Sequence, residues 1–345
     1  MIDRRTVYIL GAGASFPYGF PLGAGLRTEI LNVKPADLHQ VKFSNAGIVP
    51  KIEELTSQFK QAFEHSKSPS IDAFLANRTE FSEIGRIAIA KVLLSYERVK
   101  TLYADERNDD WLGAVLNSMR CPKIEDFLKN QVSFVTFNYD RSLELTLLNF
   151  VRHNFNHSEG DALKVVESFP IIHVYGSLGS LNPSSKNFVP YGGGTPSRSA
   201  YVGVFGDDNG HAERERYRQH LRWVASAASE IRVIPEHRDD VEPNHFSRAK
   251  ELIANAERVV MLGFAFDDLN VRRLSPELPT AIGRLENEFH GDAVCCAATI
   301  YGMAQAEVLR VARGLAREAH RLRQFRLHNM TSLQMLRHTG IHICD

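Results

Sequence analysis

The chain has 345 residues, of which 43% are hydrophobic and 24% are charged, and its 41 Lys and Arg residues balance its 41 Asp and Glu residues. This composition excludes a wholly disordered or collagen-like chain, and the zero net charge argues against a protein whose whole body binds nucleic acid. Four cysteines without a C-x-x-C pair argue against a disulfide framework and a zinc ribbon. Apolar runs such as residues 259–266 fall far short of the roughly 20 residues that span a bilayer. We expect a cytoplasmic protein that has no metal site and no membrane partner.

Short apolar runs alternate with longer helical patterns along the chain. Strands are predicted at residues 7–10, 132–137, 171–175, 231–234, 259–262 and 293–300, with helices between most of them, for example at 244–256 and 303–323. This alternation indicates a mainly parallel sheet covered on both faces. We predict an α/β fold, Rossmann-like and doubly wound, with six strands in a single domain over residues 1–345. A helical insertion is expected at about 34–130, and a loop and helix insertion at about 178–230.

A glycine turn, Gly11-Ala12-Gly13-Ala14-Ser15, follows the first predicted strand. Glycines let a backbone approach a pyrophosphate, and the helix that follows offers free N–H groups to it. The turn is not a Walker A loop, because no G-K-[ST] follows, and it departs from G-x-G-x-x-G at Phe16. A tight strand-to-helix turn without a ligand is the alternative interpretation.

The residues after this turn extend the pattern with Gly19 and Pro21. Together with the turn they resemble the signature of the sirtuin superfamily, which is G-A-G-x-S, three residues, and then G-x-P. Sirtuins continue with Asp-Phe-Arg where this chain has residues 22–24 (LGA). In this departure the chain resembles the sirtuin-like branch that is found in bacterial antiphage defence. The resemblance implies that NAD is bound by Gly11, Ala12, Gly13, Ser15 and Pro21.

The second motif is residues 136–140 (TFNYD), at the end of a predicted strand. Ligands of open α/β sheets bind outside the carboxyl ends of the strands. The motif looks like T-x-N-[IY]-D of the sirtuin superfamily, which implies that Asn138 lies by the nicotinamide ribose and helps to hold a water molecule. Asp140 is expected in the same binding region, where it shapes the loop by accepting backbone N–H bonds. A strand that ends in an Asx turn is the alternative.

The third motif is residues 171–177 (IIHVYGS), which resemble the family's segment ending in His-Gly-Ser. The family's catalytic His directly precedes the Gly, and Tyr175 occupies that position here, before Gly176 and Ser177. His173 lies two residues earlier, and residues i and i+2 of a strand share a face with Cα atoms about 6.5–7 Å apart. We therefore expect His173 and Tyr175 to face one pocket, where a neutral His173 imidazole accepts a proton or Tyr175 binds the ribose. A site that binds nucleotide without catalysis is the alternative.

The fourth motif is residues 261–268 (MLGFAFDD), which resemble the family's late strand and the turn that meets the adenosine half of the nucleotide. The resemblance implies that Gly263 allows close approach and that Phe264 lines the pocket. Asp267 or Asp268 caps the next helix or bonds a ribose hydroxyl, and we count Asp268 among the binding residues.

The resemblance of the four motifs to the sirtuin-like family implies an NAD hydrolase that cleaves the nicotinamide–ribose bond and acts as an effector of antiphage defence by abortive infection. The catalytic set is then Asn138, His173 and Tyr175, with Phe16 or Tyr18 shielding the nicotinamide. A freely running NADase would be toxic, so control by homo-oligomerisation or by a partner, such as an ATPase or sensor subunit, is expected. The alternative is a catalytically inactive nucleotide-binding sensor or structural subunit. A protein deacylase is disfavoured because the paired-cysteine zinc module is absent.

A stripe of arginines marks the predicted helix near the C-terminus, at Arg310, Arg313, Arg317 and Arg321. Spacings of three and four place them on one helix face. A solvated face is the preferred interpretation over a surface for a partner, a neighbouring subunit or nucleic acid, and direct nucleic-acid binding is not expected.

Overall fold

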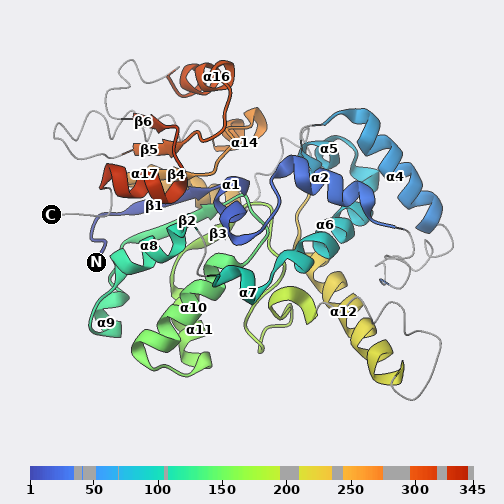
Figure 1. The fold of residues 1–345 in the computed structure, drawn as a ribbon, viewed down its shortest axis with the longest axis horizontal. Helices are drawn as coiled ribbons and strands as arrows, with labels where there is room; N and C mark the ends of the chain where they lie inside the picture. Colours follow the sequence, from blue (N-terminus) through green and yellow to red (C-terminus); the bar gives the residue numbers. More distant parts are fainter. Residues whose placement is uncertain are drawn as a thin grey trace.

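A computed structural model describes residues 1–34, 41, 52–68, 70–104, 108–194, 210–234, 244–274, 296–316 and 325–340. Its centre is a six-stranded parallel sheet in the order β3-β2-β1-β4-β5-β6 (Figure 1). The strands are β1 Thr6–Leu10, β2 Val132–Thr136, β3 Ile171–His173, β4 Arg258–Leu262, β5 Cys296–Thr299 and β6 Phe325–His328. The central strands β1 and β4 are buried along their whole length, as expected for strands covered on both faces. The predicted doubly wound, Rossmann-like α/β fold is confirmed.

The strand order reverses beside β1, because the chain builds outward to β2 and β3 and then returns to place β4 on the other side. In the parallel register, Leu10 at the end of β1 aligns with Thr136 of β2 and with Leu262 of β4. The carboxyl ends of these three strands are therefore level. In open α/β sheets, the crevice at such a reversal is where ligands bind.

One predicted strand, at residues 231–234, is absent, and one strand of the sheet, β6, was not predicted, so the expected total of six strands still agrees. Residues 231–234 follow a helix and form no strand, although the Arg232 amide donates to the Tyr175 carbonyl (2.9 Å). The apolar side chain of Ile231 is buried in the core, although its backbone does not pair with the sheet. Strand β6 was missed because the arginine-rich sequence before it favours a helix. It pairs with β5 through Cys296 and Phe325, while the predicted strand residues 293–295 lie outside the described part of the chain.

Most of the segment between β1 and β2 is helical in its described part, and much of it lies within the predicted insertion. Its elements are α1 Ala12–Ser15, η1 Phe16–Tyr18, α2 Gly23–Asn32, α4 Ile52–Ser66, α5 Ile71–Asn77, η3 Thr79–Phe81, α6 Ser82–Tyr96, α7 Val99–Leu102, α8 Trp111–Met119 and α9 Ile124–Phe127. An aromatic cluster of Phe59, Phe63, Phe74 and Phe81 joins α4 to α5 and η3. Figure 1 shows α4, α5 and α6 gathered to one side of the sheet.

The remaining helices connect later strands or cover the sheet. They are α10 Ser142–Phe155, α11 Glu159–Ser168, η4 Tyr191–Gly194, α12 Gly210–Glu230, α13 Asn244–Ala254, α14 Asp268–Leu274, α16 Gln305–Ala316 and α17 Ser332–Thr339. Helix α8 contacts both α10 and α17, whereas α13 contacts α14, and α12 packs against α6 of the insertion.

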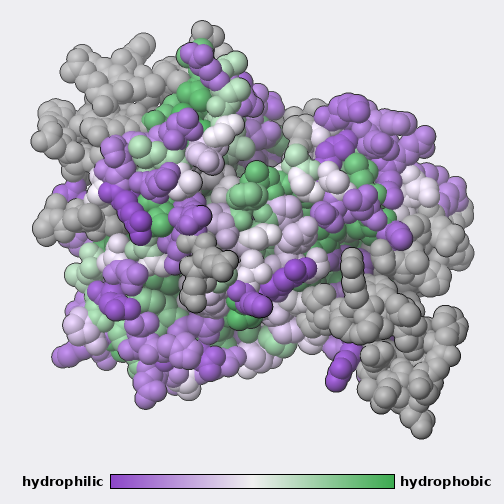
Figure 2. All heavy atoms as spheres, viewed as in Figure 1, coloured by the Kyte–Doolittle hydropathy of each residue, from purple (hydrophilic) through white to green (hydrophobic). Residues whose placement is uncertain are grey.

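Figure 2 shows mainly hydrophilic residues over one face of the molecule, with small hydrophobic patches between them. None of the helices in the described ranges has the length and apolar character needed to cross a membrane.

Candidate nucleotide-binding site

A cavity of about 250 Å³ lies at the carboxyl ends of β1, β2 and β4, where the strand order reverses. The turns that follow these strands supply its floor, and residues of α2, α5 and α6 supply the opposite wall. The structure therefore brings the three motif turns into one cleft. The sequence-predicted residues that line it are Gly11, Ala12, Ser15, Pro21, Asn138, Asp140, Tyr175 and Phe264.

The glycines of the first and fourth motifs let two turns touch. The Gly13 amide donates to the Gly263 carbonyl (3.0 Å), and a Cβ on Gly11 would lie 2.5 Å from that same oxygen. Gly263 has φ +56°, and a Cβ there would lie 2.1 Å from the Ala14 nitrogen. Gly13 and Gly263 thus shape the floor through turn packing rather than by lining the cavity.

Asn138 ties the first turn to the second. Its Nδ2 donates to the Gly11 carbonyl and to Ser15 Oγ, both at 2.8 Å, and Ser15 Oγ donates to Asp140 Oδ2 at 2.6 Å. Asp140 Oδ1 accepts from the Ser142 amide (3.1 Å), which is the loop-shaping contact expected for this residue. Because both amide protons of Asn138 are used within the protein, its side-chain oxygen is the group it can offer to a ligand hydroxyl or a water molecule.

His173 lies outside this cavity and forms a half-buried ion pair. Its Nδ1 lies 2.8 Å from the Asn138 carbonyl oxygen, and its Nε2 lies 2.6 Å from Glu144 Oε1. The carbonyl oxygen and an ionised Glu144 carboxylate both accept hydrogen bonds, so this arrangement favours an imidazole that is protonated on both ring nitrogens. Burial opposes charge on each side chain, but the attraction between them prevails, raising the pKa of His173 and lowering the pKa of Glu144. A charged imidazole cannot be the proton acceptor expected from the sequence.

The expectation that His173 and Tyr175 share a pocket is wrong. Strand β3 ends at His173, and the Gly176 amide bonds back to the His173 carbonyl (3.2 Å) in a turn, so the two-residue alternation stops. Tyr175 lines the large cavity, where its hydroxyl donates to Asn270 Oδ1 and accepts from Arg273 Nη1. His173 instead lines a separate space of about 20 Å³, beside Glu144.

Besides Gly13 and Gly263, three more predicted binding residues do not line the large cavity. Gly176 has φ +77° and contacts the end of α12, where a Cβ would lie 1.9 Å from the Glu230 carbonyl oxygen. Ser177 lines another cavity, and Asp268 is exposed and pairs with Arg310. The neighbouring Asp267 lines the large cavity and caps α14.

Asp267 Oδ1 accepts from the Leu269 and Asn270 amides, at 3.0 and 3.3 Å.

The two aromatic residues that were expected to shield nicotinamide also lie outside the cavity lining. Phe16 is 58% exposed, and Tyr18 is buried with its hydroxyl on Asp110. Phe20 lines the cavity in their place. Of the arginine stripe, Arg317 and Arg321 lie outside the described residues.

Sequence reasoning missed Asp72, which reaches the cavity from α5. The Tyr139 hydroxyl donates to Asp72 Oδ1. Burial raises the pKa of Asp72, against the opposing effects of this hydrogen bond and of the Arg273 charge. The local sequence signals only a helix start, since Ser70 Oγ accepts from the Ala73 amide (3.1 Å), and nothing in it places α5 beside β2.

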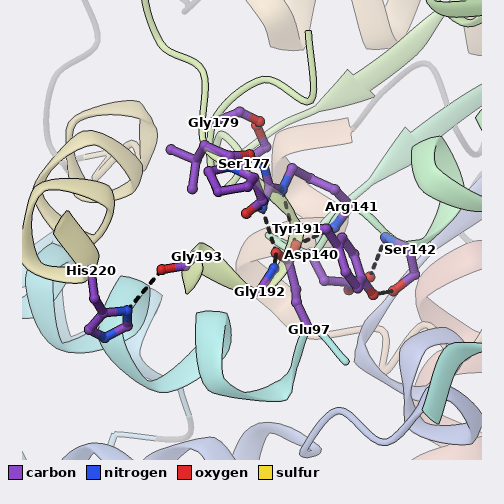
Figure 3. A network of polar contacts seen from close by, with 12 residues as sticks. Glu97, Asp140, Arg141, Ser142, Ser177, Gly179, Tyr191, Gly192, Gly193 and His220 are labelled. Atoms are coloured by element: carbon purple, nitrogen blue, oxygen red, sulfur yellow. Dashed lines mark hydrogen bonds and ion pairs between the residues drawn. The ribbon is translucent and has the colours of Figure 1, made fainter. Parts of the chain in front are cut away.

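A buried network holds the corner that carries Asp140 and Arg141 (Figure 3). The guanidinium of Arg141 pairs with Glu97 at 2.5 Å and donates to the carbonyl oxygen of Val189. The Gly192 amide donates to the same Glu97 carboxylate (2.9 Å), so one ion pair joins α6, the β2 turn and the loop after Ser177. Burial raises the pKa of Glu97, and the Arg141 charge opposes that rise.

Within the described ranges, no group of three or more His, Cys, Asp or Glu side chains is arranged to hold a metal ion. No protein-family model matches the chain, and no curated protein matches it.

Proposed function

We propose that the chain is a cytoplasmic NAD hydrolase that cleaves the nicotinamide–ribose bond and acts as an effector of bacterial antiphage defence. One observation carries this proposal: three glycine- and asparagine-bearing turns meet around a cavity at the strand reversal, where α/β proteins bind dinucleotides. Because such an activity drains NAD from the cell, the proposal includes restraint by homo-oligomerisation or by a partner protein of the defence system.

Hydrolysis of the nicotinamide–ribose bond does not require a general acid from the protein. The pyridinium ring of NAD leaves as neutral nicotinamide without a general acid, and the transition state resembles an oxocarbenium ion. The site must fix the ribose, place a water molecule and exclude bulk solvent. The side-chain oxygen of Asn138 is suited to orient the water or a ribose hydroxyl, and the aromatic side chains of Phe20, Phe137 and Phe264 are suited to keep solvent out. His173 is a positioning residue here, because it acts through the Asn138 carbonyl.

The test is to incubate purified protein with NAD and to measure free nicotinamide. We expect release by the wild type and a loss on the order of a hundredfold in Asn138→Ala, because the oxygen that orients the nucleophile is gone. Asn154→Ala is the matched control, since Asn154 is exposed on α10 and should leave release unchanged. The thermal unfolding temperature of both variants shows whether a loss of nicotinamide release comes from lost catalysis or from an unfolded protein. Equal release by the wild type and Asn138→Ala would contradict the assignment.

A nucleotide-binding sensor or structural subunit without catalysis is the second candidate. The observation that favours it is the charged His173–Glu144 pair outside the cavity, together with Tyr175 at the position where the resembling family carries its catalytic His. Calorimetric binding of NAD without nicotinamide release, in the presence of the other components of the system, would favour this candidate.

A further inference from the structure

Aromatic side chains form much of one wall of the large cavity, and none of its described lining residues is positively charged. Among the described residues, five aromatic side chains line it, and no Lys, Arg or His does; the aromatics are Phe20, Phe137, Tyr139, Tyr175 and Phe264. The ring centres of Phe137 and Phe264 lie 5.0 Å apart, and Tyr175 lies 5.9 Å from Phe137 and 6.4 Å from Tyr139. These rings form one continuous surface, and aromatic faces attract cations.

Three carboxylates line the same cavity, but two are committed to their own turns. Asp140 accepts from Ser15 and from the Ser142 amide, and Asp267 caps α14. Asp72 differs, because its side-chain partner is the phenol of Tyr139, one of the wall aromatics. Among the described residues, the Arg273 guanidinium lies over the ring of Tyr175, 5.4 Å from the ring centre, and donates to the Tyr175 hydroxyl and the Ile234 carbonyl, but Arg273 does not line the cavity.

The geometry points to a specificity device: we propose that Asp72 and the aromatic wall bind the positively charged pyridinium ring, so that the site takes NAD in its oxidised form and rejects NADH. This inference rests on the proposed function and deepens it. The dihydropyridine ring of NADH has a similar size but no charge, so only an electrostatic contact separates the two. Burial, which disfavours a lone Asp72 carboxylate, is offset when a cation enters beside it.

The experiment measures dissociation constants by calorimetry for carba-NAD and for NADH. Carba-NAD keeps the charged ring but has a methylene in place of the ribose ring oxygen, so it is not hydrolysed. We expect the wild type to bind carba-NAD at least about tenfold more tightly than NADH. Asp72→Asn, which still accepts the Tyr139 hydrogen bond, should lose most of that ratio by weakening carba-NAD alone.

Glu80→Gln is the matched control, because it makes the same carboxylate-to-amide change at an exposed surface pair with Arg78 on the same insertion. It should keep the wild-type ratio. A wild-type ratio near one, or equal weakening of both ligands by Asp72→Asn, overturns the inference.

A second measurement needs no variant and stands even where Asp72→Asn fails to fold. In the wild type, cationic 1-methylnicotinamide should displace carba-NAD at a lower concentration than neutral nicotinamide, and the reverse order contradicts the inference. Hydrolysis of NAD together with equal binding of carba-NAD and NADH removes this inference and leaves the proposed function standing. Absence of binding by either dinucleotide removes both.

Discussion

At the scale of single residues, the most informative side chain is His173, because its surroundings decide its protonation. A carbonyl and a carboxylate face its two ring nitrogens, and the separate space that it lines is about 20 Å³. Its connection to the candidate site runs through the peptide of Asn138, whose side chain bonds to Gly11 and Ser15. The ion pair of His173 with Glu144 therefore holds the backbone that presents Asn138.

The pH dependence of stability tests this ion pair. The folded pKa of His173 is raised above 6.5, so its contribution is complete below pH 6.5 and is lost as the pH rises through the folded pKa. The folded pKa of Glu144 is lowered below 4.5, so its contribution is complete above pH 4.5 and is lost as the pH falls through the folded pKa. Glu144→Gln should therefore cost most between these limits, by about 2 kcal/mol.

The measurement is the free energy of unfolding by chemical denaturation, taken at intervals from pH 4 to pH 9 for the wild type and Glu144→Gln. The cost of the substitution should shrink toward the alkaline end. Glu159→Gln on the exposed start of α11 is the control and should show a small, nearly constant difference. A Glu144→Gln cost that does not change with pH would show that His173 is neutral in the folded protein.

At the scale of elements, the site depends on turns packed backbone to backbone. Gly11 and Gly13 follow β1, Gly263 follows β4, and their atoms approach too closely for any side chain. A short α1 follows, with the Ala14 amide bonded to the Gly11 carbonyl (2.9 Å). This turn pair sets the floor on which Asn138 lies, so the glycines serve the site through packing.

Replacement of Gly263 tests that role. In Gly263→Ala the new Cβ meets backbone of the first turn, and φ is +56°, so we expect a loss of about 3 kcal/mol in the free energy of unfolding. Gly302→Ala is the matched control, because φ is +77° there and no atom lies within 4 Å of the new Cβ. It should lose about 1 kcal/mol from backbone strain alone. Similar losses in the two variants would mean that the turns can separate without cost.

At the scale of the whole molecule, the cavity belongs to two parts of the chain. The sheet supplies the strand-end turns, whereas the helices between β1 and β2 supply Asp72 and the apolar wall of Leu26, Ile71 and Leu93. The buried pair of Arg141 and Glu97 fastens these parts together, because Arg141 follows the β2 turn and Glu97 ends α6. A ligand in this cavity therefore contacts both parts.

Hydrogen exchange with carba-NAD present tests this two-sided site. We expect slower exchange in α5 together with slower exchange in residues 137–142 and 263–270, since a ligand between them suppresses local opening of both walls. Helix α11, which does not line the cavity, is the internal control. Protection of the strand-end turns alone would place the ligand on the sheet without the insertion.

The sequence by itself determined the architecture, because apolar runs and helical periodicity are local patterns. It located β1, β2, β3, β4 and β5, the glycine turn and the Asn138 corner, and it predicted a parallel sheet whose strand ends meet. It failed at residues 231–234, where apolar residues that pack against the core were predicted as a strand. It also failed at β6, because the arginine-rich sequence before that strand favours a helix. Only the tertiary structure decided that His173 and Tyr175 line different cavities, because β3 ends at His173 and the chain turns before Tyr175. Only it brought Asp72 to Tyr139, since two residues 67 positions apart meet through packing that no local pattern encodes.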